Sequence, residues 1–174
     1  GLKKVLYEYV HRVYACPSSV FLNGVIQNSN NCYQVNVTQA NSPIKLVWNN
    51  PPNSTYRMFY ECFDITEIDL TNFDTSLVTD MYSMFEYCHL VTSIDVSYLN
   101  TKKVKRMSAM FRQCFLLESL NLSSFDTTLV YETERMFSYC QSLTSIIVTH
   151  FKTEGFKDIH AMFFNNLKLT SLDL

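Results

Sequence analysis

The chain has 174 residues, of which 47% are hydrophobic and only three are glycine and four proline. This length and composition fit one folded domain, or one domain with a cap, and exclude a disordered or low-complexity chain. The formal net charge of -2 lacks the basic surplus expected of a nucleic-acid-binding protein. No apolar run approaches the roughly 18 residues that a transmembrane helix needs. Because the chain begins with Gly1 rather than Met, we expect a processed or excised product.

Residues 1–43 are predicted to form a β-rich N-terminal cap. VLYEYVHRVYA is a run of β-branched and aromatic residues, and CYQVNVTQ alternates apolar and polar positions as a half-buried strand does. Asn23-Gly24 lies between two apolar flanks, which is a strong hairpin signal. Such a cap would cover the apolar end of the first unit of a repeat array.

Cys16 and Cys32 lie in this predicted cap and are the only cysteines outside the repeat that follows it. We predict that they form a disulfide, which would close a loop of about 16 residues and stabilise the fold by roughly 3 kcal/mol. The alternative is a pair of unrelated buried thiols.

Residues 44–174 are predicted to form a second part of the chain, with a period of 26 residues and no insertion or deletion. Ile44-Lys45-Leu46 resembles a shortened first unit, and five units with a Met-Phe pair follow. Columns that recur over five units predict a stacked core. The columns predicted to form this core are Met58, Phe59, Cys62, Met84, Phe85, Cys88, Met110, Phe111, Cys114, Met136, Phe137, Cys140, Met162 and Phe163.

Each unit is predicted to form one strand and one helix. In TEIDLT, the apolar Ile68 and Leu70 alternate with polar residues, as in a strand with one buried face. In VTDMYSMFEYC, apolar residues recur every three or four positions, as on one side of a helix. Asp74, Thr75 and Ser76 precede that segment and are predicted to be N-cap residues, which would give a local reason for the recurring threonine.

Stacked strand-helix units predict an α/β repeat solenoid of the leucine-rich-repeat kind, whose repeat length is about 20 to 29 residues. Over roughly residues 56–174 the unit resembles the 26-residue repeat of BspA-like surface proteins of bacteria and protists. It matches most fully at 116–140 and 66–88, and departs from the pattern at YLNTKKV and FKTEGF. The resemblance implies a secreted or surface-exposed protein that acts in adhesion or binding, with no chemistry of its own.

The cysteine column is predicted to be buried packing. On neighbouring helices, whose axes lie about 8 to 10 Å apart, these cysteines would be too far apart to form disulfides. A structural zinc site uses close pairs such as C-x2-C rather than one thiol in every unit. We therefore predict no metal site and no cofactor.

Polar side chains are predicted to form an outward polar face on the sheet, which is the candidate interaction face for a protein or glycan ligand. Because parallel strands lie about 4.8 Å apart, its stacked carboxylates would repel one another and could recruit a cation or a basic partner. A solvated polar surface is the alternative. The residues of this polar face are Glu67, Asp69, Ser93, Asp95, Ser119, Asn121, Ser145 and Asp173.

Basic residues gather in one unit, where either a solvated helix edge or a contact with an anionic glycan or nucleic acid would explain them. They are Lys102, Lys103, Lys105, Arg106 and Arg112. The four histidines, His11, His89, His150 and His160, follow no ligand or catalytic pattern. The chain also lacks a nucleophile elbow, a P-loop and a dinucleotide-binding fingerprint. We therefore predict no enzymatic activity.

Three N-x-S/T sequons, at Asn36, Asn53 and Asn121, are predicted glycosylation sites of a secreted protein. Asn53 lies in a proline-rich loop and is the most accessible of the three. Asn121 falls on a predicted strand and is the least convincing.

The chain stops at TSLDL, on a predicted strand, so we expect an apolar end that either further units or another chain would cover. The N-terminal run could add a strand to that end of a neighbouring copy, and head-to-tail stacking of this kind would build a filament. The sequence thus predicts an extracellular or cell-surface adhesion protein that binds a protein or glycan. A self-assembling filament subunit is the alternative, and neither nucleic-acid binding nor membrane insertion is expected.

Overall fold

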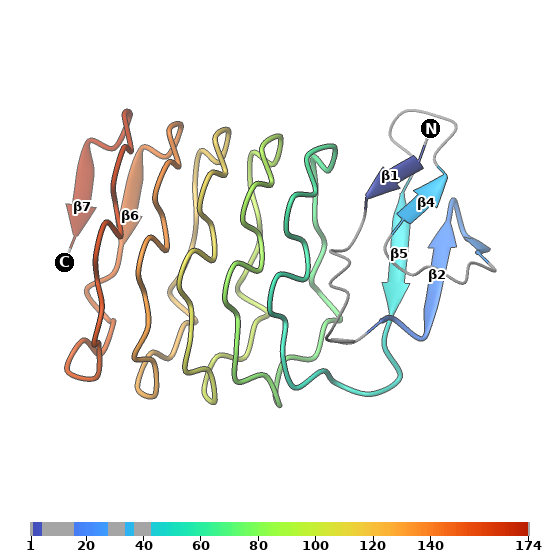
Figure 1. The fold of residues 1–174 in the computed structure, drawn as a ribbon, viewed down its shortest axis with the longest axis horizontal. Coiled ribbons are helices and arrows are strands. Elements are labelled where there is room, and N and C mark those ends of the chain that lie inside the picture. The colour runs from blue at the N-terminus through green and yellow to red at the C-terminus, as the bar shows by residue number, and fades with distance from the viewer. Residues whose placement is uncertain (1, 5–15, 28–33, 37–42, 174) are drawn as a thin grey trace.

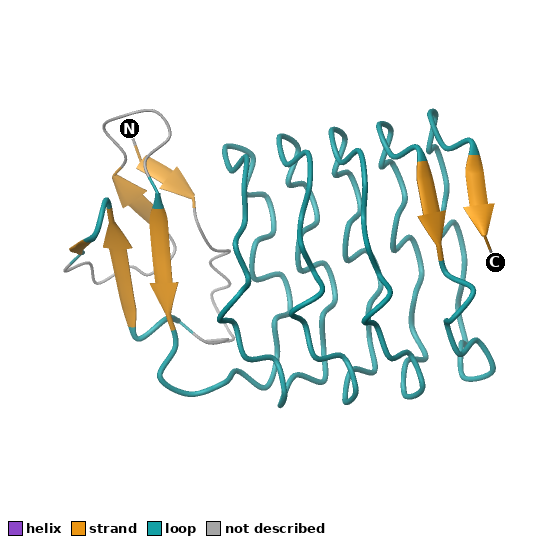
Figure 2. Ribbon diagram, turned by 180° about the vertical axis from the view of Figure 1, so that it is seen from behind, coloured by secondary structure: helices purple, strands orange, loops and turns teal. Residues whose placement is uncertain are grey.

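The computed structural model of the protein describes residues 2–4, 16–27, 34–36 and 43–173. These described residues contain seven short strands and no helix. Five strands lie at one end of the molecule and two at the other, with a stack of irregular loops and turns between them (Figures 1 and 2). The described part of the chain therefore has no helix with the length and hydropathy to cross a membrane.

The N-terminal strands form two small antiparallel sheets. β1 (Leu2–Lys4) pairs with β4 (Gln34–Asn36). β2 (Ser19–Leu22) lies between β3 (Val25–Ile26) and β5 (Ile44–Val47) and pairs with both. β5 thus belongs to the sheet of the N-terminal hairpin.

The predicted hairpin at Asn23-Gly24 is confirmed. Leu22 pairs with Val25 across the turn, and the φ angles of Asn23 and Gly24 are 50° and 79°. Both angles lie in the left-handed region, as a two-residue type I′ turn requires. The strand predicted over 5–15 lies outside the described residues.

The repeating part forms a stack of five rungs with the predicted 26-residue period (Figure 1). The rungs are residues 53–78, 79–104, 105–130, 131–156 and 157–173. Backbone amides of one rung donate to carbonyl oxygens of the next. The amide of Phe59 donates to Met84 at 2.8 Å, and the amide of Phe85 donates to Met110 at 2.9 Å. The period therefore sets the hydrogen-bond register of the whole stack.

Strands are shorter in this stack than the sequence predicts. Only β6 (Ser145–Ile147) and β7 (Ser171–Asp173) form a described two-stranded parallel sheet, with Ser145 opposite Ser171. Between the second and third rungs, the same part of the unit makes one parallel bridge, from Ser93 to Ser119.

The predicted helices, and with them the α/β solenoid of strand-helix units, are wrong, because the described residues hold no helix and only a few short strands. The segment 78–88 forms consecutive tight turns instead. The amide of Met84 donates to the Met81 carbonyl at 3.2 Å, and the amide of Cys88 donates to the Phe85 carbonyl at 3.1 Å. Alternate amides donate to the next rung and are unavailable to a helix. Consecutive tight turns also bury an apolar side chain every three or four residues. The spacing of apolar residues alone therefore could not distinguish these turns from an α-helix.

Two columns of these turns hold non-glycine residues in the left-handed region, with φ between 52° and 66°. The residues are Arg57, Glu61, Ser83, Tyr87, Ala109, Gln113, Arg135, Tyr139, Ala161 and Asn165. A positive φ at the third turn residue is the geometry of a type II turn, and it is incompatible with a right-handed helix. Each such residue costs about 1 to 2 kcal/mol, which the contacts between rungs must offset.

The Met-Phe columns fill the interior of the stack. The rings of Phe59, Phe85, Phe111, Phe137 and Phe163 stack in sequence, with neighbouring centroids 5.5 to 5.8 Å apart. The methionines beside them are buried in the first four rungs, whereas Met162 and Phe163 of the fifth rung are partly buried.

The cysteine column lies beside the phenylalanines. Its members are Cys62, Cys88, Cys114 and Cys140, and all four are buried free thiols. The thiol of Cys88 donates to the Phe59 carbonyl oxygen at 3.2 Å, and the next two cysteines make the same contact one rung further along. Burial raises the pKa of the Cys114 thiol well above its ordinary value, so these groups are poor nucleophiles.

The recurring threonines and aspartates do not cap helices, so the predicted N-cap role is wrong. The Thr75 hydroxyl accepts the Asn100 amide at 2.7 Å and lies 3.2 Å from the Asn100 carbonyl oxygen, to which it donates. Asp74 accepts the Ser76 amide at 2.8 Å, which closes an Asx turn. The threonine column therefore joins neighbouring rungs, and the aspartate shapes the corner that presents it.

Candidate binding faces

The eight residues of the polar face are all exposed. In β6, Ser145 and Ile147 point outward while Ile146 is 2% exposed. The predicted alternation of inward and outward side chains is thus present at this strand. The face runs along the stack because Ser93 and Ser119 are bridged in parallel.

Local turns explain much of the acidic column on the polar face. Asp69 accepts hydrogen bonds from both the hydroxyl and the amide of Thr71, and Asp95 accepts the Ser97 amide at 3.0 Å. These hydrogen bonds from Thr71 and Ser97 lower the pKa of Asp69 and of Asp95, so both carboxylates are ionised at neutral pH. Asn121 makes the same turn without a charge.

The charge of the polar face is nonetheless one-sided. Its stretches 66–71, 92–97, 118–123 and 170–173 each contain at least one carboxylate, stretch 144–149 contains none, and none of the five contains lysine or arginine. Among the described residues, no three or more His, Cys, Asp or Glu side chains are grouped so as to hold a metal ion. The polar face is therefore an acidic surface that would suit a basic partner.

A second face, on the consecutive turns, gathers tyrosines around an arginine on the first two rungs. We call Tyr56, Arg57, Tyr60, Tyr82 and Tyr87 the tyrosine-arginine cluster. The rings of Tyr56 and Tyr82 stack at 5.2 Å. The Arg57 guanidinium lies 4.7 Å from the centroid of Tyr60, and also over Tyr56 and Tyr82. These contacts hold the side chains in one arrangement.

One phenol of the tyrosine-arginine cluster, that of Tyr60, is held in its neutral form. Burial, and next the negative charge of Glu86, raise the pKa of Tyr60 to about 12. Tyr60 meets Tyr87 edge to face at 5.4 Å. All five residues of the cluster are half-buried. Each tyrosine therefore offers part of an apolar ring and a hydroxyl group that can donate a hydrogen bond.

An ion pair between the half-buried Arg112 and the buried Glu86 adjoins the cluster at Tyr87. Arg112 Nη1 lies 2.5 Å from Glu86 Oε1, whose side chain is only 5% exposed. The Ser83 hydroxyl also donates to Glu86, and the Arg112 guanidinium lies over the Tyr87 ring at 5.7 Å. Because a buried charge must be paired, this arrangement fixes the second and third rungs relative to each other.

A ladder of charges runs beside the cluster. Arg106 donates to Asp80 of the preceding rung at 3.0 Å and to Glu132 of the following rung at 2.7 Å. Burial lowers the pKa of Arg106, but its hydrogen bond to Glu132 and the charges of both carboxylates raise it overall. Two of the five predicted basic residues, Arg106 and Arg112, are thus committed to ion pairs, whereas Lys102, Lys103 and Lys105 are exposed.

The histidines of the described residues lie apart from one another in unrelated surroundings. His89 lies between Phe63 and Phe115, with ring centroids at 4.9 and 4.6 Å, and burial lowers its pKa. Its Nε2 is buried and makes no hydrogen bond within the described residues. His150 Nε2 lies 2.9 Å from a backbone carbonyl oxygen, and His160 is exposed. His11 lies outside the described residues.

The remaining predicted sites are placed only in part. Cys16 is disulfide-bonded, and its predicted partner Cys32 lies outside the described residues. Asn36 ends β4, and Asn53 and Asn121 are both exposed.

Sequence reasoning missed the tyrosine-arginine cluster because it followed the columns that repeat. The cluster occupies columns at which the units differ. Tyr60 is followed one and two units later by Glu86 and Arg112, and Arg57 by Ser83. In an array of similar units, a change of side chain at an outward column is the signal that distinguishes a specific surface from the shared framework.

The fold and these faces define a class of repeat protein built from stacked 26-residue rungs. The family model described as Mycoplasma protein of unknown function, DUF285, matches residues 53–172, which is more than half of the chain and coincides with the rungs. The chain belongs to this family. Comparison with the curated proteins and with the solved structures gave no match.

Proposed function

We propose that this is a non-enzymatic, extracellular or cell-surface binding protein that acts in adhesion and contacts a protein partner through the tyrosine-arginine cluster. The observation that carries the proposal is the packing of three half-buried tyrosines around Arg57 on two adjacent rungs, with a fourth, Tyr87, packed against Tyr60. Tyrosine and arginine are enriched among the residues that dominate protein interfaces. Their fixed arrangement lowers the entropy lost on binding.

Several observations support a surface location, a non-enzymatic role and a second binding surface. The resemblance of the units to BspA-like surface repeats favours a surface location. Cys16 is disulfide-bonded, as is common in proteins of oxidising compartments. The raised pKa of Cys114, in a column of four buried thiols, argues against cysteine nucleophiles. The acidic polar face is a second surface in the same proposal, for a basic protein segment or a glycan.

Adhesion of coated beads tests the proposal. Beads that carry the whole chain would be applied to cultured cells and to plates coated with extracellular-matrix extract, and the bound fraction would be measured. We expect Arg57→Ala and Tyr82→Ala to weaken adhesion about tenfold or more, which corresponds to a loss of at least about 1.4 kcal/mol. Tyr98→Ala is the matched control, because Tyr98 is 50% exposed and lies outside the cluster.

The outcomes separate the two faces. Equal losses for Tyr98→Ala and Tyr82→Ala, or full adhesion of both cluster variants, would contradict the role of the cluster. A loss confined to Glu67→Gln and Asp95→Asn would move the binding surface to the polar face. Biotinylation of intact producing cells with an impermeant reagent tests the location, and protection of the protein would contradict it.

Self-association through the fifth rung is the second candidate function, as in a filament subunit. This rung exposes Ile159 by 63%, Phe164 by 55% and Leu167 by 72%. In each of the four preceding rungs, the two backbone amides at the positions that match Ala161 and Phe163 donate to carbonyl oxygens of the following rung. Sedimentation velocity over a concentration series tests this candidate. We expect Leu167→Asp to abolish self-association, and a monomer at every concentration of the unaltered chain would contradict it.

A further inference from the structure

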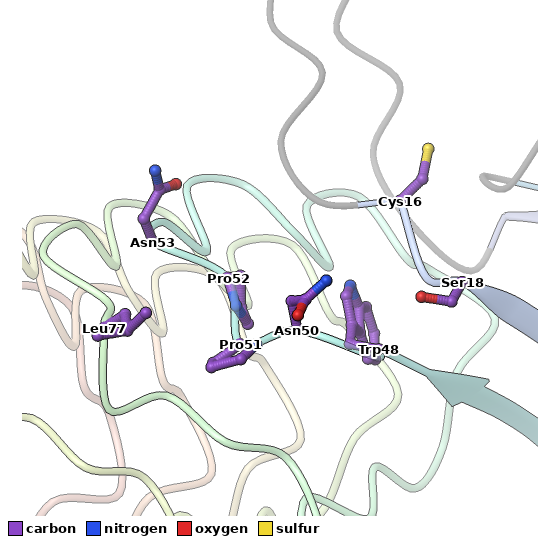
Figure 3. Close-up of a pocket in the computed structure, with 8 residues that line it drawn as sticks. All are labelled: Cys16, Ser18, Trp48, Asn50, Pro51, Pro52, Asn53 and Leu77. Carbon is purple, nitrogen blue, oxygen red and sulfur yellow. The ribbon is translucent and has the colours of Figure 1, made fainter.

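A shallow cleft of about 400 Å³ lies where β5 leads into the first rung (Figure 3). Trp48 and Asn50 line it from the connecting loop, Ser18 from the position just before β2, and Asn53 and Leu77 from the two ends of the first rung. The described residues that line the cleft carry no charge. It therefore differs from both binding faces, each of which includes charged side chains.

The loop that forms the cleft is held in place at both ends. The Asn49 amide donates to the Ser18 hydroxyl at 3.0 Å, and the Thr79 amide donates to the Asn53 carbonyl oxygen at 3.0 Å. Trp48 packs against Phe73, with ring centroids 4.8 Å apart. Pro51 and Pro52 restrict the backbone between these points. A site fixed in this way loses little entropy when a ligand binds.

The lining combines two kinds of group. Trp48, Pro51 and Leu77 provide an apolar wall, and the aromatic ring has a partly negative face that attracts slightly positive C–H groups. Asn50 and Ser18 provide an amide and a hydroxyl group, each able to donate and accept hydrogen bonds. A pyranose sugar matches both, because it has a C–H face and a rim of hydroxyl groups.

We propose that this cleft is a binding site for a neutral sugar residue. Its volume lies at the lower end of the range for small-molecule sites, about 300 to 1,000 Å³. Among the described residues that line the cleft none is charged, which disfavours phosphate and uronic acids, because these need cationic partners. An extended peptide is the less favoured ligand, because such recognition uses a continuous row of backbone groups along a strand edge or a long aromatic-lined groove.

Trp48 is the only tryptophan of the chain, so its fluorescence reports this cleft alone. The whole chain would be titrated with the methyl glycosides of glucose, galactose and N-acetylglucosamine. We expect a saturable change in emission for at least one of them, with a Kd of about 1 to 10 mM. Glucuronic acid and a decaproline peptide are the comparison ligands, and neither is expected to saturate.

Variants test whether the cleft itself binds the sugar. Asn50→Ala should weaken binding about fivefold by removing an amide that bonds a sugar hydroxyl. Asn72→Ala, at another exposed asparagine, should leave the Kd unchanged. Ser18→Ala gives a second reading if Asn50→Ala does not fold, as judged by its thermal unfolding.

Each remaining outcome overturns the proposal. These are no saturable response to any of the three glycosides, saturation by decaproline alone, and an unchanged Kd in every cleft variant that folds. The site is separate from the tyrosine-arginine cluster, so none of these outcomes would bear on adhesion.

Discussion

At the scale of single residues, the buried threonines tie neighbouring rungs together. Thr101 is 1% exposed, and its hydroxyl accepts the Asp126 amide at 2.7 Å and donates to the Asp126 carbonyl oxygen at 3.1 Å. Thr101→Val keeps the shape but leaves the partly buried amide and carbonyl oxygen of Asp126 without this partner, so we expect the free energy of unfolding to fall by about 1 to 3 kcal/mol. Urea denaturation measures this. Thr92→Val, at an exposed threonine, is the control and should change little.

His89 makes the stability of the protein depend on pH. Burial lowers its pKa in the folded state from the ordinary 6.5, so the unfolded state binds the proton more readily. Stability is therefore fully present above about pH 6.5 and is lost as pH falls through the lower folded pKa. Thermal unfolding between pH 8 and about 5 measures the loss, in a range above most carboxylate titration.

His89→Phe should remove this pH dependence, because phenylalanine occupies the same column in the neighbouring rungs, at Phe63 and Phe115. His160→Gln, at an exposed histidine, should preserve it. An equal pH dependence in His89→Phe would contradict the assignment to His89.

At the scale of elements, the turns with positive φ reverse the usual ranking of alanine and glycine. Arg135 is exposed and has a φ of 54°. We expect Arg135→Gly to be more stable than Arg135→Ala by about 1 kcal/mol, because glycine adopts this conformation without strain. At Thr128, which does not have a positive φ, glycine should be the less stable of the two. Chemical denaturation of the four variants decides the matter.

The elements show what sequence reasoning could and could not supply. The 26-residue period, the hairpin at Asn23-Gly24 and the inward alternation at β6 were readable, since each depends on local pattern. The absence of helices from the described rungs could not be predicted from the sequence. An amide such as that of Phe85 can bond within a helix or to the next rung, and only the stacked neighbour decides between them. Neither helix-like spacing nor the N-cap pattern at Asp74 contains that information.

The same limit applies to the candidate sites. The outward positions of the polar face followed from the alternation of residues, and all of them are exposed. The tyrosine-arginine cluster needs contacts between side chains of different rungs, such as Tyr56 with Tyr82, and the cleft at Trp48 needs the hairpin to meet the first rung. Such contacts follow from the stacking geometry rather than from the pattern within one unit.

At the scale of the whole molecule, ion pairs distinguish rungs that are otherwise alike. Deletion of residues 133–158 removes one full period and keeps Glu86 beside Arg112. Deletion of residues 107–132 removes the same length but places Glu86 beside Ser138. Because Glu86 is buried and would lose its cation, we expect the second deletion to be less stable by about 3 kcal/mol.

Denaturation of both deletion proteins measures this difference. A third protein that carries the second deletion together with Ser138→Arg should recover much of the lost stability, because the arginine restores the cation at the matching column. Equal stability of the two deletions would show that the order of the rungs is set by something other than this pair.

The ladder of backbone hydrogen bonds between rungs also has a mechanical consequence. A force that pulls the two ends apart along the stack acts on these bonds in series, so that one rung can peel away while the next stays folded. Each released rung of 26 residues lengthens the chain by about 90 Å. A tether of this kind yields in steps and dissipates load, which would suit a molecule that holds a surface against shear.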